Sequence, residues 1–247
     1  MNLNLADIRE YVFPLFVADD PALHEPTHPI LVNRENFLGT AFFVSKNGIA
    51  LTAGHCTPDP ANLPSGKALI AAIWDGQRAR AQQVQLATVL NGQDLAVLKV
   101  SHSPAKFLPV SFEQVHMGED VASVGVPLHS VSGEAFEYRC LKGHVTFVSK
   151  TLELSYPAPR GMSGSPVLRN GRVVGVLSWN ARSEALEDQS DEVVEKIGAT
   201  TRVTKTVTMS VTNYGQAEQL HALERMVIPL AEGLAFKDLL AKMNRAK

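Results

Sequence analysis

Cysteine is scarce in this sequence, with only Cys56 and Cys140 among 247 residues. Small secreted domains that depend on disulfides for stability carry many more. The N-terminal stretch MNLNLADIREYVFPLF also lacks the basic leader, apolar core and cleavage site of a secretory signal. We therefore expect both thiols to be reduced and the protein to be cytoplasmic.

Long apolar runs and an excess of charge of one sign are also missing. No run approaches the roughly 18 consecutive apolar residues of a membrane-spanning helix. The chain carries 23 basic and 25 acidic residues, so the basic stripe typical of nucleic-acid binding is not indicated. We expect neither a membrane nor a nucleic acid among its partners. There is also no CxxC pair and no glycine motif for a nucleotide phosphate, and we predict no metal and no cofactor.

Short runs rich in Val, Thr, Ile and Phe dominate residues 30–215 and favour β-strands. Asn47-Gly48 and Asn170-Gly171 each lie between two such runs, which is typical of tight hairpins. The spacing of the runs predicts an all-β sandwich or barrel. The runs are TAFFVS, IALTA, DLAVLKV, VASVGV, HVTFVS, SPVL, RVVGVLSW and TKTVTMSVT.

Both ends of the chain differ from this middle region. Residues 1–29 are predicted to be an N-terminal arm, with a short helix in the first twelve residues and then an irregular, proline-punctuated stretch. Residues 216–247 are predicted to be a helical extension, because apolar residues recur at the i, i+3, i+4, i+7 spacing. Pro229 and Gly233 should divide it into two helices. Its apolar stripe either packs on the β core or binds a partner.

An acidic segment interrupts the β pattern at 183–198, with six acidic residues and one lysine. We expect an exposed loop or a short helix there. Its charge is interpreted either as a solvated face or as a docking surface. The arm, this segment and the helical extension are the places where a regulatory protein partner could act.

Three separated residues have the side chains needed for nucleophilic catalysis. Ser163 lies in GMSGSPVL, His55 in LTAGHC and Asp94 in NGQDLAVLKV. A serine hydroxyl is a weak nucleophile until a neutral imidazole accepts its proton, and a carboxylate must orient that imidazole. Each motif alone is more typical of an ordinary turn or a structural histidine. If Asp94 does not orient His55, another carboxylate such as Asp75 would have to do so.

The order of these motifs resembles that of the chymotrypsin-like serine proteases, above all the bacterial trypsin-like peptidases of the HtrA/Deg type and the glutamyl endopeptidases. The resemblance covers about residues 30–215 and implies a trypsin-like domain of two six-stranded antiparallel β-barrels, followed by the helical C-terminal extension. The matching segments are GTAFFVS at 39–45, LTAGHC at 51–56, DLAVLKV at 94–100, VGVP at 124–127, GMSGSPVL at 161–168 and GRVVGVLSW at 171–179.

The resemblance also implies a role for each catalytic residue. Ser163 would be the nucleophile, His55 the general acid and base, and Asp94 the residue that orients His55. His55 and Asp94 would come from the first barrel and Ser163 from the second. The backbone N–H groups of Gly161 and Ser163 would form the oxyanion hole, and Gly164 would relieve crowding behind the nucleophile.

This sequence departs from the digestive enzymes of the family at two points. Met162 stands where those enzymes have an aspartate that pairs with a newly cut N-terminus, so we do not expect activation by N-terminal cleavage. The bridge partner expected for Cys56 falls at Thr40, so the common disulfide is absent. In contrast to the HtrA-type relatives, we expect no C-terminal PDZ domain, which would need about 80–100 residues.

The family resemblance also locates the pocket for the substrate side chain before the scissile bond. No acidic residue lies between Leu154 and Ser163, so lysine and arginine should be poor substrates, because a buried cation needs a partner. We expect a small or medium apolar residue instead, with glutamate as the alternative because Arg160 could be its counter-ion. The implied substrate-binding residues are Pro157, Ala158, Pro159, Arg160, Ser178, Trp179 and Asn180.

The sequence therefore predicts a serine endopeptidase that hydrolyses protein or peptide substrates through an acyl-enzyme intermediate. Two alternatives stay open. One is a catalytically silent binding or scaffold protein on a protease fold, and the other is an esterase that uses the same three residues.

Overall fold

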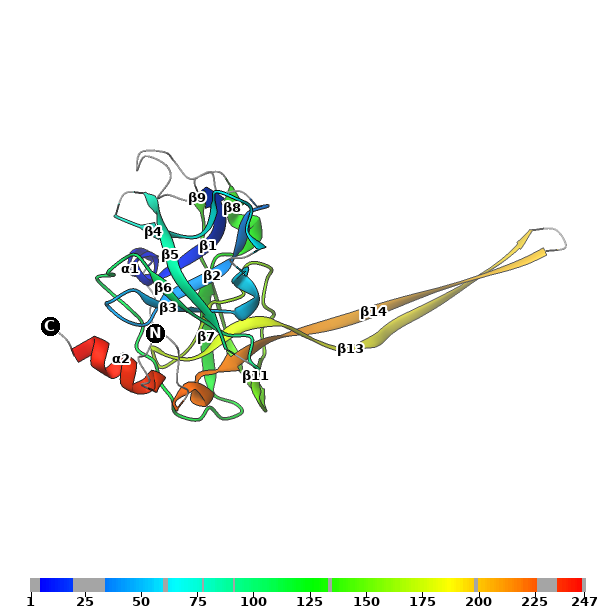
Figure 1. Cartoon of the computed structure of the whole chain (residues 1–247). Coiled ribbons are helices and arrows are strands. Elements are labelled where there is room, and N and C mark those ends of the chain that lie inside the picture. The colour runs from blue at the N-terminus through cyan, green and yellow to red at the C-terminus, as the bar shows by residue number, and fades with distance from the viewer. Residues whose placement is uncertain are drawn as a thin grey trace.

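The computed structural model describes residues 5–19, 34–59, 62–76, 78–90, 92–132, 135–197, 200–225 and 235–245. Helix α1 (Leu5–Tyr11) confirms the short helix predicted near the N-terminus. None of the helices in these ranges is long and apolar enough to cross a membrane. Two closed β-barrels make up the body of the molecule (Figure 1).

The first barrel contains six antiparallel strands in the order β1-β2-β3-β6-β5-β4. Its strands are β1 (Val12–Asp19), β2 (Phe37–Phe43), β3 (Ile49–Thr52), β4 (Lys67–Trp74), β5 (Ala79–Val89) and β6 (Ala96–Val100). Phe13, Phe42 and Phe43 are almost completely buried in its core. The boundary predicted at residue 30 is therefore wrong, because β1 belongs to the barrel. β1 is almost entirely buried and shows no polar alternation, so it does not have the pattern of a half-exposed strand.

The second barrel contains six antiparallel strands in the order β10-β11-β14-β13-β12-β7. The strands are β7 (Asp120–Gly125), β10 (Arg139–Val148), β11 (Thr151–Leu154), β12 (Pro166–Arg169), β13 (Arg172–Ile197) and β14 (Thr200–Gln219). A separate pair is formed by β8 (Val131–Ser132) and β9 (Ala135–Phe136). The predicted fold of two six-stranded antiparallel barrels is confirmed.

Both predicted tight turns connect paired strands. Gly48, between β2 and β3, has a φ of 78°. Asn170 and Gly171, between β12 and β13, have φ values of 51° and 78°, as a type I′ turn requires. Asparagine and glycine adopt this left-handed conformation more readily than other residues, and the two dipeptides therefore set the register of both hairpins.

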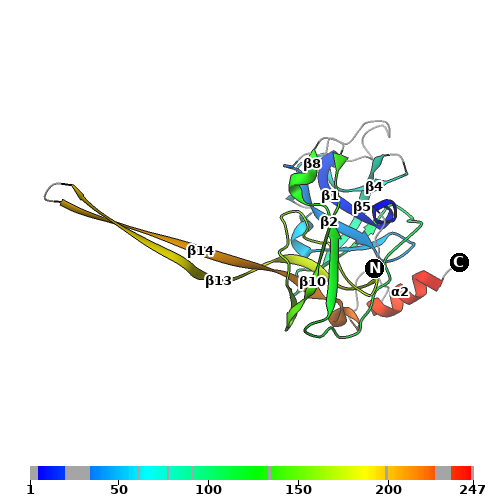
Figure 2. The ribbon, with the colours of Figure 1, turned by 180° about the vertical axis from the view of Figure 1, so that it is seen from behind.

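Strands β13 and β14 continue beyond the barrel as a long two-stranded ribbon, on the side of the molecule opposite the C-terminal helix (Figures 1 and 2). The loop or short helix predicted at 183–198 is therefore wrong, since β13 extends to Ile197. The alternating Val and Thr residues of β14 favour a strand, and pairing with it overrides the low strand propensity of the acidic residues. The register pairs Glu192 with Lys205 and Glu195 with Arg202.

The C-terminal extension is only partly helical. Helix α2 (Phe236–Arg245) buries Phe236, Leu239 and Leu240 against the core, so its apolar stripe packs on the body of the protein. The helical prediction is wrong for residues 216–219, which belong to β14, and η4 (Leu220–Leu223) is a single 3-10 turn. The break predicted at Pro229 and Gly233, and the irregular arm at 21–29, lie outside the described residues.

Candidate active site

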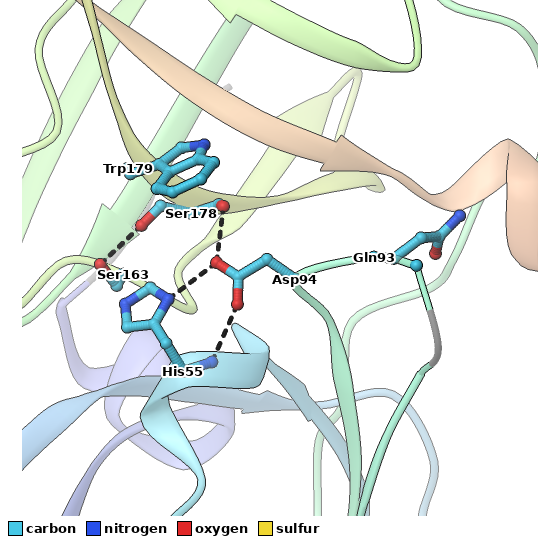
Figure 3. Close-up of a pocket in the computed structure, with 7 residues that line it drawn as sticks. His55, Gln93, Asp94, Ser163, Ser178 and Trp179 are labelled. Carbon is cyan, nitrogen blue, oxygen red and sulfur yellow. Dashed lines mark hydrogen bonds and ion pairs between the residues drawn. The ribbon is translucent and has the colours of Figure 1, made fainter.

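A cleft of about 560 Å³ contains all three predicted catalytic side chains (Figure 3). His55 comes from the 3-10 turn η1 (Gly54–Cys56), Asp94 from the loop before β6, and Ser163 from the loop before β12. The cleft is lined by His55, Gly92, Gln93, Asp94, Ser163, Ser178 and Trp179. The fold thus brings together residues that are far apart in the sequence.

Asp94 holds His55 through both of its carboxylate oxygens. The distance from His55 Nδ1 to Asp94 Oδ2 is 2.7 Å, and the backbone N–H of His55 donates to Oδ1 at 2.8 Å. A Cβ atom at Gly54 would lie 3.0 Å from the same Oδ1, so glycine allows this close approach. The two bonds fix both the position and the orientation of the imidazole.

Ser178 gives Asp94 a third hydrogen bond, with a distance of 2.8 Å from Oγ to Oδ2. The sequence assigned Ser178 only to substrate binding and did not predict this contact. Only the docking of β13 against the loop before β6 brings the two residues together, and no sequence motif indicates that docking. Gly92 and Gln93 were also missed as residues that line the cleft.

The contact between His55 and Asp94 stabilises the charged form of both groups. The hydrogen bond to Asp94 is the main cause that raises the pKa of His55 to about 10, against partial opposition from burial. Burial tends to raise the pKa of Asp94, but hydrogen bonds from His55 and Ser178 outweigh it and hold that pKa at about 2. At neutral pH the two side chains therefore form an ion pair in this arrangement.

The hydroxyl group of Ser163 donates to the backbone carbonyl of Ser178 at 2.7 Å (Figure 3). Within the described part of the chain it makes no hydrogen bond with His55. This geometry agrees with a charged imidazole, because a protonated ring has no lone pair to accept the hydroxyl proton. Proton transfer from Ser163 therefore requires neutral His55 and a rotation of the hydroxyl toward it.

Two backbone hydrogen bonds hold the peptide units that lead to Ser163. The N–H of Leu128 donates to the carbonyl of Arg160 at 2.7 Å, and the N–H of Ser165 donates to the carbonyl of Met162 at 3.0 Å. In a trans peptide the C=O and the N–H point in opposite directions. The N–H groups of Gly161 and Ser163 therefore point away from these contacts, and neither finds an acceptor among the described residues.

The two glycines around Ser163 are required by the backbone. Gly161 has a φ of 95°, and a Cβ atom there would lie 2.5 Å from the nitrogen of Leu128. Gly164 has a φ of 87°, and a Cβ atom there would overlap the carbonyl oxygen of Thr40. The GMSG sequence thus permits both the left-handed turn and the close contact with the first barrel.

Both cysteines are unpaired, with Cys56 buried and Cys140 exposed. The position that faces Cys56 was predicted one residue too late. A Cβ atom at Gly39, not at Thr40, would lie 2.5 Å from Cys56 Sγ. The sequence alignment by motif could not settle this register, because Gly39 and Thr40 are adjacent on β2 and face opposite sides of the strand.

The predicted substrate-binding residues separate into two groups. Ser178 and Trp179 line the cleft, and Trp179 is 58% exposed. The segment 157–160 does not contribute to the lining, with Pro157 and Arg160 exposed and Ala158 buried. The side chain of Asn180 lies outside what the structure describes.

One sequence match runs against the prediction of no metal site. Residues 24–28 read HEPTH, which fits the HExxH pattern of zinc enzymes. That pattern binds zinc when both histidines share one face of a helix, and the proline between them disfavours a helix. The segment lies outside the described residues, which themselves contain no cluster of three or more His, Cys, Asp or Glu residues suited to a metal ion.

The structure has two closed barrels, and one cleft contains an acid–histidine pair and a serine. This is the arrangement that the resemblance to the chymotrypsin-like serine proteases implied. Residues 39–176, more than half of the chain, match the family model of the trypsin-like peptidase domain. The chain therefore belongs to the trypsin-like peptidase family, and the predicted resemblance is confirmed.

Two solved structures share this fold at low sequence identity. Neuropsin, a serine protease from the limbic system of mouse brain, superimposes with a TM-score of 0.54 and 12% identity, over 89% of this chain and 93% of that chain. Kallikrein-related peptidase 10, in a complex with Zn²⁺, gives a TM-score of 0.50 and 15% identity, over 72% and 85%. No curated protein matches the chain by sequence.

Proposed function

We propose that this protein is a serine endopeptidase in which His55, Asp94 and Ser163 form the catalytic triad. The observation that carries the proposal is the contact of both Asp94 oxygens with His55, in the same cleft as Ser163. Membership of the trypsin-like peptidase family supports the same class of substrate, a protein or a peptide.

The reaction begins with neutral His55 accepting the hydroxyl proton of Ser163. Ser163 Oγ forms a bond to the carbonyl carbon of the substrate, and the carbonyl oxygen becomes an oxyanion. His55 then gives the proton to the leaving amine, the C–N bond breaks, and an acyl-enzyme is left. Water attacks the acyl-enzyme with His55 again as the base, which releases the acid and restores Ser163.

The N–H groups of Gly161 and Ser163 bind the oxyanion in this proposal. Their lack of an acceptor among the described residues supports the role, because both donors are available to substrate. Asp94 orients the imidazole so that Nδ1 carries the proton and Nε2 faces Ser163. Ser178 supports this orientation through its bond to Asp94.

The alternative of a silent binding protein has one observation in its favour. The hydroxyl group of Ser163 donates to the carbonyl of Ser178 rather than to His55. A fluorophosphonate probe separates the two possibilities, because it forms a covalent bond only with an activated serine. Labelling of Ser163 supports catalysis, and absence of labelling in the folded protein supports the silent alternative. Comparison of matched peptide and ester substrates tests the esterase alternative.

For the residue before the scissile bond, the proposal favours a small or medium apolar side chain, with glutamate as the alternative. No acidic residue lies between Leu154 and Ser163, so this segment offers no carboxylate to pair with a substrate cation. A peptide library varied only at this position tests the preference. Dominant cleavage after lysine or arginine would refute it.

A further inference from the structure

The loop that carries Gly161 and Ser163 lacks the charged partner expected from the digestive enzymes. Met162, the residue before the nucleophile, is completely buried and carries no charge. Its backbone N–H donates to the carbonyl of Pro159 at 3.0 Å, which closes a tight turn within the loop. A turn of this kind, with a left-handed glycine inside it, has more than one accessible arrangement of its peptide units. The Leu128 N–H holds the 160–161 peptide unit from outside the loop, and the 161–162 unit needs an outside contact of its own.

Thr40 supplies such a contact from the first barrel. This residue lies on β2 and is completely buried. Its backbone N–H donates to the carbonyl of Ser163 at 2.8 Å, and its hydroxyl donates to the carbonyl of Gly161 at 3.1 Å. Thr40 thus bonds to the peptide units 161–162 and 163–164, and each of these is next to a peptide unit that carries one of the two oxyanion N–H groups.

The hydroxyl of Thr40 has no freedom to turn away from Gly161. The N–H of Val126, next to the end of β7, donates to the same oxygen at 3.0 Å. A hydroxyl that accepts a hydrogen bond from one buried partner directs its own proton to the other. The N–H of Val126 therefore fixes the orientation in which the Thr40 hydroxyl donates to the carbonyl of Gly161.

Other side chains of the described residues do not replace this contact. The remaining one that reaches the backbone of 159–163 from the first barrel is Cys56, whose Sγ lies 3.7 Å from the carbonyl of Ser163. A thiol is a weak donor, and it reaches a carbonyl that the Thr40 N–H already binds. The carbonyl of Gly161 depends on the Thr40 hydroxyl.

We infer that Thr40 is a positioning residue that holds the oxyanion loop in its active arrangement through its hydroxyl group. The inference rests on the proposed function of the cleft. Because Thr40 is part of the folded first barrel, the loop is ordered without cleavage of the chain and without a buried ion pair. Thr40 does not touch the substrate in this account. It holds the carbonyls of Gly161 and Ser163, and it thereby limits rotation of the neighbouring peptide units that carry the Gly161 and Ser163 N–H groups.

The decisive variants are Thr40→Val, which keeps the shape and removes the hydroxyl, and Thr40→Ser, which keeps the hydroxyl. Loss of one oxyanion donor typically costs on the order of 10²–10³ in rate, so partial misalignment should lower kcat by roughly 10- to 100-fold in Thr40→Val. KM should change by less than about threefold, because the substrate-lining residues are untouched. Thr40→Ser should keep kcat within about threefold of the wild type.

Thr52→Val is the matched control. Thr52 is equally buried, and its hydroxyl donates to the carbonyl of Thr40 at 2.7 Å without a bond to the loop. It should lower the melting temperature and leave kcat within about threefold. A peptide aldehyde, whose hemiacetal oxygen occupies the oxyanion hole, should lose affinity in Thr40→Val by the same factor as kcat. An unchanged kcat and aldehyde affinity in Thr40→Val, or an equal loss in Thr52→Val, would overturn the inference.

Hydrogen exchange of the peptide spanning residues 159–165 gives a readout that does not depend on activity. Exchange should be faster in Thr40→Val than in Thr52→Val or the wild type, because the turn loses its external contact. If the wild type neither hydrolyses peptides nor reacts with a fluorophosphonate, the proposed function fails, and equal exchange in the two variants then overturns the role of Thr40 separately. Should Thr40→Val not fold, Thr40→Ala is compared with Thr40→Ser in the same three measurements.

Discussion

At the scale of single residues, Asp94 is the acceptor on which the cleft depends. It receives bonds from the His55 ring, the His55 backbone N–H and the Ser178 hydroxyl. The other carboxylate considered from the sequence, Asp75, accepts from the Arg78 backbone and pairs with Arg80. The structure therefore leaves Asp94 as the residue that can orient His55.

Replacement of Asp94 by asparagine should reduce kcat by about 10⁴-fold, because the amide cannot hold the imidazole in the required tautomer. Steady-state kinetics on a cleaved peptide measure the loss, and circular dichroism checks that the variant is folded. Asp75→Asn is the control and should keep near-normal kcat. Normal turnover in Asp94→Asn would contradict the assignment.

The pH dependence of the reaction follows from the raised pKa of His55. Only the neutral imidazole accepts a proton, so kcat/KM should rise with pH through the pKa of His55 in the free enzyme. Asp94 raises that pKa toward about 10 from its ordinary 6.5. The His55 side chain is 47% exposed, so solvent screens the pair, and the midpoint should lie between these two values. A pH–rate profile with its rise below pH 6.5 would contradict this.

The same pair makes stability depend on pH in a defined direction. The contribution of His55 is full below pH 6.5 and is lost as the pH rises through its raised pKa in the folded state. The contribution of Asp94 is present above pH 3.8 and is lost as the pH falls through about 2, because its pKa is lowered. The difference in urea stability between wild type and Asp94→Asn should therefore be largest between about pH 4 and 6.5.

At the scale of elements, the parts of β13 and β14 that form the ribbon do not pair with the other strands of the second barrel. Strand β13 pairs with β12 only through residues 172–176, and β14 pairs with β11 only through residues 215–218. Beyond these residues the two strands pair with each other. The ribbon therefore adds length to two barrel strands without adding a strand to either barrel.

Replacement of residues 183–212 by Asn-Gly should leave both barrels folded. The dipeptide would connect Arg182 and Asn213, which are paired in the register, through a two-residue turn. The melting temperature should change by less than about 4 °C, equivalent to about 1 kcal/mol in a chain of this size. A shorter replacement, of residues 190–207, is the graded control. Loss of cooperative unfolding in the larger deletion would show that the ribbon supports the second barrel.

The elements that sequence reasoning predicted are those with strong local signals. Asn47-Gly48 and Asn170-Gly171 fix their turns through backbone conformation, and the two hairpins follow. β1 was missed because it is buried on both faces, and the ribbon was missed because pairing with β14 decides the structure of its acidic strand. Local propensity cannot report such pairing.

The residues of the candidate site also divide into those that local motifs indicate and those that no motif indicates. His55, Asp94 and Ser163 were found because each lies in a motif and the three occur in a recognised order. Ser178 and Thr40 were not assigned their contacts, because both act across the boundary between distant segments. The hydrogen-bond partners of these two hydroxyl groups depend on how the two barrels dock, and no local motif in the sequence indicates that docking.

At the scale of the whole molecule, the barrels are held together without a disulfide. Cys56 is buried beside the nucleophile loop and Cys140 is exposed on β10. Thiol titration under denaturing, non-reducing conditions should therefore report two thiols, and titration of the native protein should report one fast-reacting thiol. The first value follows from the absence of a disulfide between the two cysteines, and the second follows from the burial of Cys56. A value near zero after denaturation would show a disulfide between the two cysteines and would contradict the proposed cytoplasmic location.

The most direct test of the account combines covalent labelling with hydrolysis in the wild type and in Ser163→Ala. The wild type should cleave peptides and should carry a fluorophosphonate adduct on Ser163, located by mass spectrometry. Ser163→Ala should fold normally, take no label and lose activity by several orders of magnitude, as the loss of a covalent nucleophile predicts. Peptide hydrolysis near the wild-type rate in Ser163→Ala would contradict the central claim.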